Sequence, residues 1–257
     1  MELSIDLKRH AYGELDALQD IRLNVKSGEI VCVIGPSGCG KSTLLGIIGG
    51  LVRPTDGTIR LRGAAPEGCL NELTYIFQDF ALLPWRTVYD NVSLVFEHHA
   101  LGRSEIARRV EDVLARTGLL QYRSFFPKQL SGGMRQRVGI ARALAVRPAV
   151  LLMDEPFSAL DAQTRELLID DFLELWGREK LTAIYITHNL EEAIRTADKI
   201  LVLCRRPGRI KDFIEVPITQ SERQEPNNRT KLNEIEQHIW SMIRQEAIIA
   251  NEEVAGA

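Results

Sequence analysis

A segment near the N-terminus combines glycines, a lysine and hydroxyl side chains at a spacing that suits a phosphate group. The glycines let the backbone wrap closely, so that successive N–H groups and the following helix N-terminus face negative charge. Lys41 would place a positive charge at the β- and γ-phosphates of a nucleotide, and Ser42 would offer a hydroxyl ligand to Mg²⁺. The predicted phosphate loop consists of Gly35, Pro36, Ser37, Gly38, Cys39, Gly40, Lys41, Ser42 and Thr43.

Two acidic residues follow a later apolar run, Val150–Met153. A buried strand holds such carboxylates rigidly at its carboxyl end, which is where ligands bind in open α/β sheets. We expect Asp154 to hold Mg²⁺ through water and Glu155 to be the base that polarises an attacking water. On its own, an acidic strand end is as often a solvated structural feature. Together with a phosphate loop, it predicts nucleotide hydrolysis.

A turn rich in glycine, Leu130–Gly133, lies between these two motifs. Ser131 can cap the helix that begins after it, and Gly132 and Gly133 can bring bare backbone N–H groups to a γ-phosphate. In isolation this would be an ordinary helix start. The order of phosphate loop, Leu-Ser-Gly-Gly turn and acidic strand end resembles the ATP-binding subunit of ABC transporters. Met134 departs from the glutamine often found there and leaves the phosphate-facing positions unchanged.

The resemblance implies roles for four further residues and a head-to-tail dimer. ATP would lie between the phosphate loop of one domain and the Ser131–Gly133 turn of a second. Gln78 resembles a glutamine that approaches the metal and the water, and His188 resembles a switch that contacts the γ-phosphate. Asp161 falls in the segment that crosses the dimer interface. Tyr12 stands where these proteins place an aromatic residue on adenine, although a lone tyrosine or histidine is more often structural.

Apolar patterning indicates an α/β fold for this chain. Near-continuous apolar runs at 29–34, 149–154 and 182–187 are typical of strands buried on both faces, and their alternation with helical stretches indicates a mostly parallel sheet. With the resemblance, we expect a P-loop NTPase core with a mostly parallel sheet, an N-terminal antiparallel β subdomain and a helical subdomain at about 88–145. The predicted ATPase domain covers residues 1–210.

A short C-terminal extension, residues 211–257, is expected to contain an amphipathic helix. Its apolar residues recur at helical spacing, which usually means packing against the chain's own domain. Membrane contact or partner docking is the alternative. The residues of this stripe are Leu232, Ile235, Ile239, Met242 and Ile243.

Composition excludes several other classes of protein. The chain has 32 Lys and Arg residues against 35 Asp and Glu residues. The resulting net charge of −3 does not indicate the excess of positive charge that is typical of nucleic-acid-binding proteins. No apolar run approaches the ~20 residues of a membrane helix, so any membrane role must come through partners. The four cysteines show no paired metal-ligand spacing and are expected to be free thiols. Because Cys39 lies in the phosphate loop, its alkylation is expected to block ATPase activity.

The resemblance therefore implies an ATPase subunit of a membrane importer, held peripherally at the cytoplasmic face of the inner membrane. Its expected partners are separate transmembrane permease subunits, a second ATPase copy or paralogue and an extracytoplasmic substrate-binding protein. Two segments, Leu82–Val88 and Arg206–Ile210, resemble the branch that imports nitrate, sulfonate or taurine. The segment after Gln78 is expected to dock the permease.

Two alternatives remain open at this point. An ABC-type ATPase acting on DNA or ribosomes usually carries a long coiled-coil insertion or two cassettes, and this chain has one cassette and a short segment between Gln78 and Leu130. A nucleotide-binding regulator without hydrolysis is disfavoured because both Glu155 and His188 are present. Of these two, the DNA- or ribosome-acting ATPase is the stronger alternative.

Overall fold

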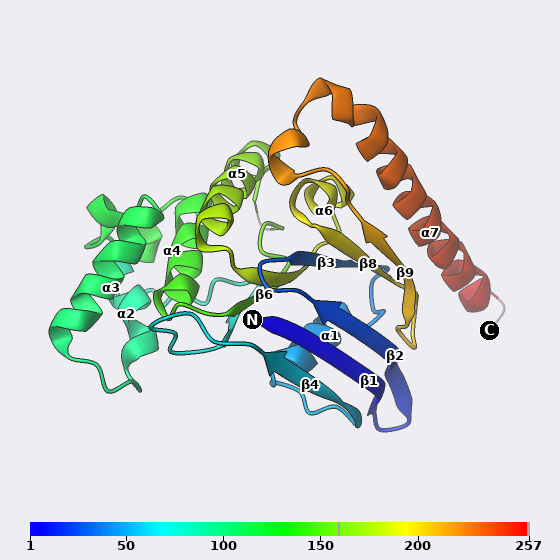
Figure 1. The fold of residues 1–257 in the computed structure, drawn as a ribbon, viewed down its shortest axis with the longest axis horizontal. Coiled ribbons are helices and arrows are strands. Elements are labelled where there is room, and N and C mark those ends of the chain that lie inside the picture. Colours follow the sequence, from blue (N-terminus) through cyan, green and yellow to red (C-terminus); the bar gives the residue numbers. More distant parts are fainter. Residues whose placement is uncertain (159, 256–257) are drawn as a thin grey trace. The chain divides into compact units, whose positions relative to one another are not determined.

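The computed structural model describes residues 1–158 and 160–255, with side chains as far as Glu246. Ala159, which belongs to the predicted interface segment 158–161, lies outside the described residues. The chain forms two compact units, one of residues 1–63 with 182–257 and the other of residues 64–181 (Figure 1).

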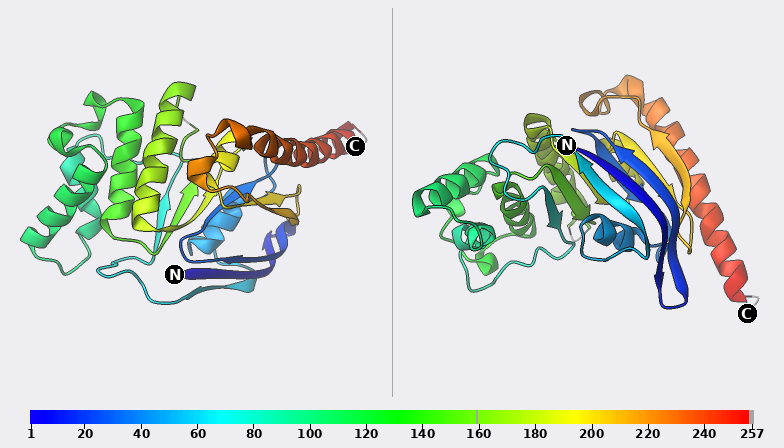
Figure 2. Two further views of the ribbon diagram at one scale, coloured as in Figure 1. Left: turned by 45° about the horizontal axis from the view of Figure 1, so that its top comes forward. Right: turned by 60° about the horizontal axis from the view of Figure 1, so that its bottom comes forward.

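The first unit contains a three-stranded antiparallel sheet in the order β2-β1-β4. Its strands are β1 (Glu2–Tyr12), β2 (Leu15–Val25) and β4 (Asp56–Arg62), which lie side by side in both views of Figure 2. Leu3, Ile5 and Leu7 alternate along β1 and are all buried, as expected for a sheet with one covered face. The N-terminal antiparallel subdomain is confirmed.

The same unit contains the parallel strands that precede the phosphate loop and His188. Strand β3 pairs in parallel with β7 and β8, and β8 pairs antiparallel with β9. All five residues of β3 are buried, which explains its continuous apolar sequence. The elements are β3 (Ile30–Ile34), α1 (Lys41–Ile48), β7 (Thr182–Ile186), α6 (Leu190–Thr196), β8 (Lys199–Leu203) and β9 (Ile210–Glu215).

The second unit combines a parallel strand pair with helices. Strand β5 (Leu73–Ile76) pairs with β6 (Val150–Asp154), the strand that ends in the first acid. The longer helices are α2 (Val88–Ser93), α3 (Arg103–Arg116), α4 (Gly132–Ala145) and α5 (Ala162–Glu179). With the parallel pairs of the first unit, these elements confirm the α/β class and its mostly parallel strands.

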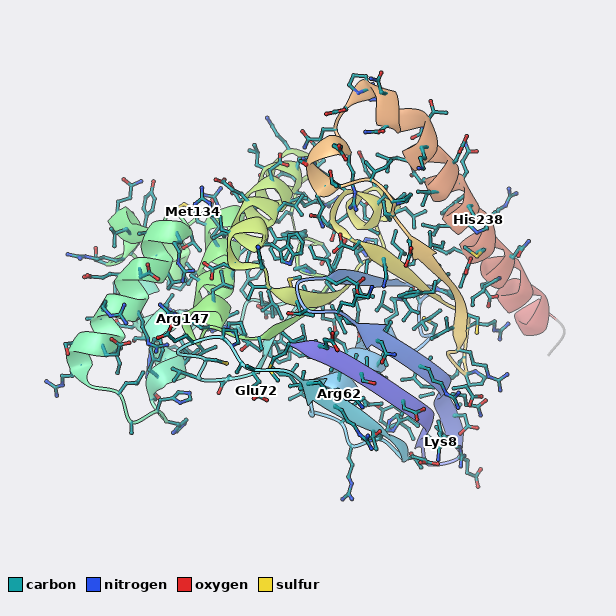
Figure 3. The ribbon with its side chains drawn as sticks, in the orientation of Figure 1. Lys8, Arg62, Glu72, Met134, Arg147 and His238 are labelled. Atoms are coloured by element: carbon teal, nitrogen blue, oxygen red, sulfur yellow. The ribbon has the colours of Figure 1, made fainter. Side chains whose placement is uncertain are left out.

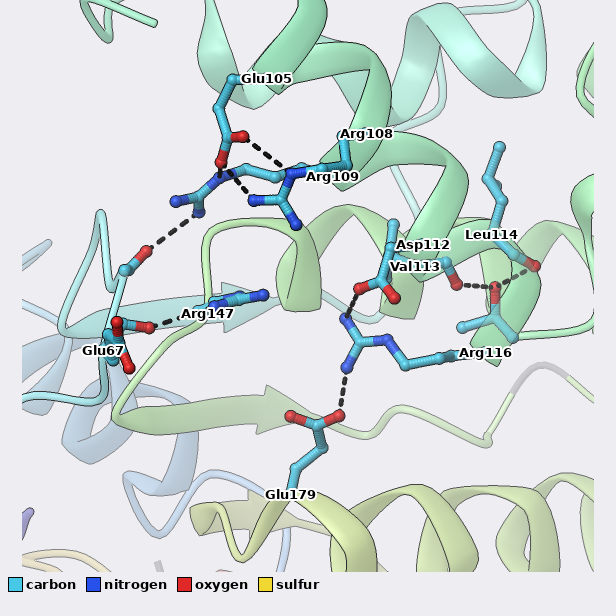
Figure 4. Close-up of polar contacts among 12 residues, drawn as sticks. Glu67, Glu105, Arg108, Arg109, Asp112, Val113, Leu114, Arg116, Arg147 and Glu179 are labelled. Atoms are coloured by element: carbon cyan, nitrogen blue, oxygen red, sulfur yellow. Dashed lines mark hydrogen bonds and ion pairs between the residues drawn. The ribbon is translucent and has the colours of Figure 1, made fainter.

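Arginine side chains of α3 form hydrogen bonds and ion pairs with other segments of the second unit (Figure 4). Arg109 is buried, donates to the carbonyl oxygen of Gly68 at 2.9 Å and pairs with Glu105 at 2.7 Å. Arg116 pairs with Asp112 at 3.2 Å and also with Glu179 of α5. Exposed pairs of this kind contribute little stability. The buried contact of Arg109 fixes the position of α3.

The C-terminal helix α7 (Arg229–Ala255) packs against its own unit. Ile239 and Met242 of the predicted stripe are buried, and His238 lies 3.4 Å from the Asp212 carboxylate of β9 (Figure 3). Packing against the chain's own unit is therefore observed for this stripe. None of the described helices has the length and apolar character that a membrane crossing requires.

Candidate functional site

The phosphate loop connects β3 to α1, as the sequence predicts. Gly38 and Gly40 have φ angles of 76° and 101°, in the left-handed region that favours glycine. The Nζ atom of Lys41 donates to the carbonyl oxygens of Gly35 at 2.9 Å and Pro36 at 3.0 Å. The lysine charge thus lies over the loop, and the first turn of α1 directs backbone N–H groups toward the same region.

Cys39 is the buried side chain of this loop, at 1% exposure. A Cβ atom built on Gly35 would lie only 2.9 Å from its sulfur, which shows how closely the loop folds around the thiol. Burial is the main cause that raises the pKa of Cys39. All four cysteines are free, as predicted.

Alkylation of Cys39 is expected to be slow and strongly pH-dependent. Because its pKa is raised, the thiolate becomes abundant only above the ordinary cysteine value of about 8.5. Because Cys39 is buried whereas Cys69 and Cys204 are partly exposed, iodoacetamide should modify Cys69 and Cys204 first, and loss of ATPase activity should follow modification of Cys39. Mass spectrometry of labelled peptides across a pH series measures this. Full activity with Cys39 fully alkylated would contradict the expectation.

The two acids lie at and just beyond the end of β6. Glu155 has a φ of 45°, which for a residue other than glycine costs on the order of 1–3 kcal/mol. Two hydrogen bonds, from different segments of the chain, hold the turn in which Glu155 adopts this φ angle. Ser158 donates its Oγ–H to the Glu155 carbonyl at 3.0 Å, and the buried Gln136 of α4 donates to the carbonyl of Pro156. The backbone of the turn that carries Glu155 is thus held by contacts with Ser158 and α4.

Asp154 has an aromatic neighbour on the adjacent strand. Burial, followed by the Asp154 carboxylate, raises the pKa of Tyr75 well above its usual range. The Tyr75 hydroxyl therefore stays protonated at neutral pH and donates a hydrogen bond to the Asp154 carboxylate.

Gln78 lies close to the turn that carries Glu155. It follows β5, is exposed, and its Nε2 donates to Ser158 Oγ at 3.4 Å. Since Ser158 also bonds to the Glu155 carbonyl, the structure brings together two of the predicted site residues. This contact lies entirely within the second unit.

The Ser131–Gly133 turn opens helix α4. Ser131 is the N-cap, and its Oγ accepts from Met134 N at 3.2 Å, so the predicted cap is confirmed. A Cβ atom on Gly133 would lie 3.0 Å from Thr164 Cγ2 of α5. Glycine at this position therefore lets the start of α4 lie against α5. Met134, labelled in Figure 3, follows on the first turn of α4.

Helix α4 also contacts the segment that follows Gln78. Arg142 donates to the carbonyl oxygens of Phe80 at 2.6 Å and Ala81 at 2.9 Å. Gln136 of α4 also donates to the carbonyl of Pro156. Helix α4 therefore contacts both the segment after Gln78 and the turn after Glu155. Neither role could be predicted from the sequence, because each side chain bonds to a carbonyl group far along the chain and no local pattern indicates such a contact.

The three remaining candidate site residues lie at or next to the ends of strands and helices. His188 is exposed between β7 and α6, and Tyr12 is 52% exposed at the end of β1, edge-to-face with His10 at 4.8 Å. Asp161 caps α5 by accepting from Thr164 N at 3.0 Å, and this bond lowers the pKa of Asp161. The phosphate loop, Tyr12 and His188 belong to the first unit, and the other candidates belong to the second.

The predicted metal ligands suit a cation that arrives with a nucleotide. Within residues 1–158 and 160–255, no cluster of three or more His, Cys, Asp or Glu could hold a metal by itself. Ser42, Gln78 and Asp154 instead offer hydroxyl, amide and carboxylate oxygens. Mg²⁺ is commonly bound by one or two carboxylates, waters and substrate phosphate, so this donor chemistry fits it.

Comparison with known proteins gives consistent matches over most of the chain. A family model described as ABC transporter matches residues 18–158. An uncharacterized ABC transporter ATP-binding protein of Methanocaldococcus jannaschii is 41% identical over 234 residues, 90% of this chain and 86% of that protein. A nitrate import ATP-binding protein of Synechocystis sp. is 41% identical over 85% of this chain and 82% of its own. A taurine import ATP-binding protein of Jannaschia sp. is 41% identical over 90% of this chain and 88% of its own length.

A solved structure shares the fold as well as the sequence. A dimeric ATP-binding cassette in a post-hydrolysis state, bound to ADP and phosphate, has a TM-score of 0.69 and 32% identity. The match covers 85% of this chain and all of that one.

Proposed function

Because the chain belongs to the ABC transporter ATP-binding family, we propose that it hydrolyses Mg-ATP to drive a membrane importer of a small anion. The observation that carries the proposal is the arrangement of the motif-bearing elements. Helix α4, capped by Ser131, is bonded both to the turn after Glu155 and to the segment after Gln78. The first unit supplies the strand–loop–helix that suits phosphate.

The phosphate loop binds the nucleotide in this proposal. Backbone N–H groups of the loop and the start of α1 surround the β-phosphate, and Lys41 exchanges its carbonyl partners for phosphate oxygens. The half-exposed ring of Tyr12 offers a face on which adenine stacks. Ser42, Gln78 and Asp154 would hold Mg²⁺, which neutralises charge on the phosphates.

Hydrolysis depends on Glu155 as the general base. Its carboxylate accepts a proton from the attacking water, while Gln78, linked to the same turn through Ser158, orients that water. His188 contacts the γ-phosphate from the end of β7. The strained backbone at Glu155 supports this role, because such strain concentrates at functional positions.

A second ATPase subunit completes the site in this proposal. Ser131, Gly132 and Gly133 at the start of α4 contact the γ-phosphate held by the partner, and Asp161 lies at the interface. The similarity to a dimeric cassette supports this arrangement. The partner subunit is a second copy of this chain or a close paralogue.

The segment that follows Gln78 is the proposed docking surface for the permease. Asn91, fully buried, donates to the carbonyls of Leu83, Arg86 and Thr87 at 2.9–3.1 Å. These bonds hold the turn that leaves Trp85 71% exposed. An exposed tryptophan on a rigid turn is a suitable anchor for a partner. Docking there would place the subunit peripherally at the cytoplasmic face of the inner membrane.

The proposed cargo is a small anion such as nitrate, a sulfonate or taurine, delivered by an extracytoplasmic binding protein. Support comes from the nitrate and taurine import relatives and from the Leu82–Val88 and Arg206–Ile210 segments. Cargo choice resides in the binding protein and the permease rather than in this chain.

Reconstitution tests this function directly. The chain would be purified with the permease that co-purifies from detergent-solubilised membranes and placed in liposomes with the binding protein. We expect ATP-driven uptake of labelled nitrate or taurine, and none with Lys41→Ala. Uptake of neither anion despite active hydrolysis would overturn the cargo proposal. ATPase stimulation by DNA or ribosomes, and not by the permease, would favour the alternative function.

A further inference from the structure

The turn between β8 and β9, residues 204–209, packs directly behind the phosphate loop. A Cβ atom built on Gly208 would lie 2.1 Å from the carbonyl oxygen of Cys39 and 2.9 Å from Leu18 Cδ2. A Cβ atom on Gly35 would likewise lie 2.7 Å from the carbonyl oxygen of Leu203. The loop and the end of β8 with its turn are therefore in backbone contact at two places, with no room for a methyl group at either.

Strand β2 holds this turn in place through its backbone. Gly208 N donates to Ala17 O at 2.9 Å, and Gln19 N donates to Gly208 O at 3.0 Å. The guanidinium of Arg209 also donates through Nε to Gln19 Oε1 at 3.1 Å. Both backbone groups of Gly208 are thus fixed by one neighbouring strand, on which the turn is anchored.

The C-terminal helix α7 provides a second anchor. Glu246, which is buried, accepts from Arg205 N at 2.9 Å through one carboxylate oxygen. Its other oxygen pairs with the Nζ atom of Lys211 at 2.7 Å. One carboxylate thus joins α7 to the first part of the turn and to β9, far from the phosphate loop in sequence.

The phosphate loop contains a long backbone hydrogen bond and glycines with left-handed backbone. Cys39 N donates to Pro36 O at 3.3 Å, a long bond inside the loop, and two glycines of the loop have left-handed φ angles. A glycine-rich loop has high conformational freedom, and phosphate binding requires its N–H groups to be pre-oriented. A rigid surface behind the Cys39 carbonyl supplies that orientation.

We propose that the 204–209 turn, anchored by β2 and by Glu246 of α7, sets the position of the phosphate loop, with Gly208 as a positioning residue for ATP binding. The inference rests on the proposed function, because it requires this loop to bind ATP. It also gives the Arg206–Ile210 segment and the C-terminal helix a role in the nucleotide site itself.

The substitution Gly208→Ala tests the proposal. The φ angle of Gly208 lies outside the left-handed region, so the change introduced by alanine is a methyl group that meets the Cys39 backbone and the Leu18 side chain. We expect KM for ATP and Kd for a non-hydrolysable ATP analogue to rise on the order of 10-fold or more, since a shift of about 1 Å can cost ~100-fold. The value of kcat should change less, and the protein should remain folded by circular dichroism.

Gly177→Ala in α5 is the matched control, because a Cβ atom there has no neighbour within 4 Å. Its KM should equal that of wild type. If Gly208 has a purely structural role, Gly208→Ala would lower the midpoint temperature of thermal unfolding. It would then leave KM for ATP unchanged at temperatures well below that midpoint. That result would overturn the proposal.

A second variant covers the case in which Gly208→Ala does not fold. Glu246→Gln weakens the link between α7 and Arg205 and adds no atoms beside the loop. It should raise KM for ATP in the same direction by a smaller factor, about 3-fold, as expected for one weakened charge-assisted bond. An unchanged KM in this variant would overturn the proposal. If wild type itself binds no ATP analogue, the proposed function fails together with it.

Discussion

Replacing Glu155 by glutamine is expected to lower kcat for ATP hydrolysis by ~10²–10⁴-fold, the usual contribution of a general base. Glutamine keeps the shape of the side chain and its place on the turn held by Ser158 and Gln136. It cannot accept a proton from water at neutral pH. Binding of ATP should persist, because the substitution leaves the phosphate loop unaltered.

Glu166→Gln is the matched control for this substitution. Glu166 is exposed on α5, so the same loss of charge should leave kcat within about twofold of wild type, as for most surface substitutions. Phosphate release at saturating Mg-ATP measures both variants. Wild-type turnover by Glu155→Gln would show that another group is the base.

Replacing Lys41 by alanine is expected to weaken ATP binding on the order of 10²-fold, and hydrolysis with it. Its Nζ atom lies over the carbonyls of Gly35 and Pro36, poised to meet phosphate oxygens. Truncating one member of a desolvated, hydrogen-bonded charge pair costs about 2–5 kcal/mol, which corresponds to this loss. Isothermal titration with a non-hydrolysable ATP analogue measures the change.

Lys8→Ala gives the corresponding control within the same unit. Lys8 is 63% exposed and pairs with Asp56 at 3.6 Å on the antiparallel sheet. A surface pair of this kind contributes about 0–1 kcal/mol to stability and nothing to phosphate binding. Equal ATP affinities of the two lysine variants would contradict the assignment of Lys41.

Much of the fold and of the candidate site could be predicted from local sequence. The phosphate loop lies between β3 and α1 because a β-branched run and a glycine-rich segment specify strand, turn and helix within a few residues. The Ser131 cap was likewise predictable, since serine before a helix satisfies the first free N–H groups. Helical spacing also predicted that Ile239 and Met242 would be covered.

Other features depend on contacts between distant segments and escaped prediction. Gly208 meets Cys39 because β8 lies beside β3, which no sequence window contains. Gln136 reaches Pro156 and Arg142 reaches Phe80 only after α4 has packed. Residues other than glycine rarely adopt the left-handed backbone conformation that Glu155 has, so residue propensity alone does not predict it.

Dimer formation by Glu155→Gln in Mg-ATP tests the central claim most directly, because it requires ATP binding, a defective base and a partner turn together. Size-exclusion chromatography would compare wild type and variant with and without Mg-ATP, while hydrolysis is followed in parallel. We expect the variant to form a stable dimer only with Mg-ATP and to lose turnover. A variant that stays monomeric and hydrolyses ATP at the wild-type rate would contradict both the assigned base and the shared two-ATP site.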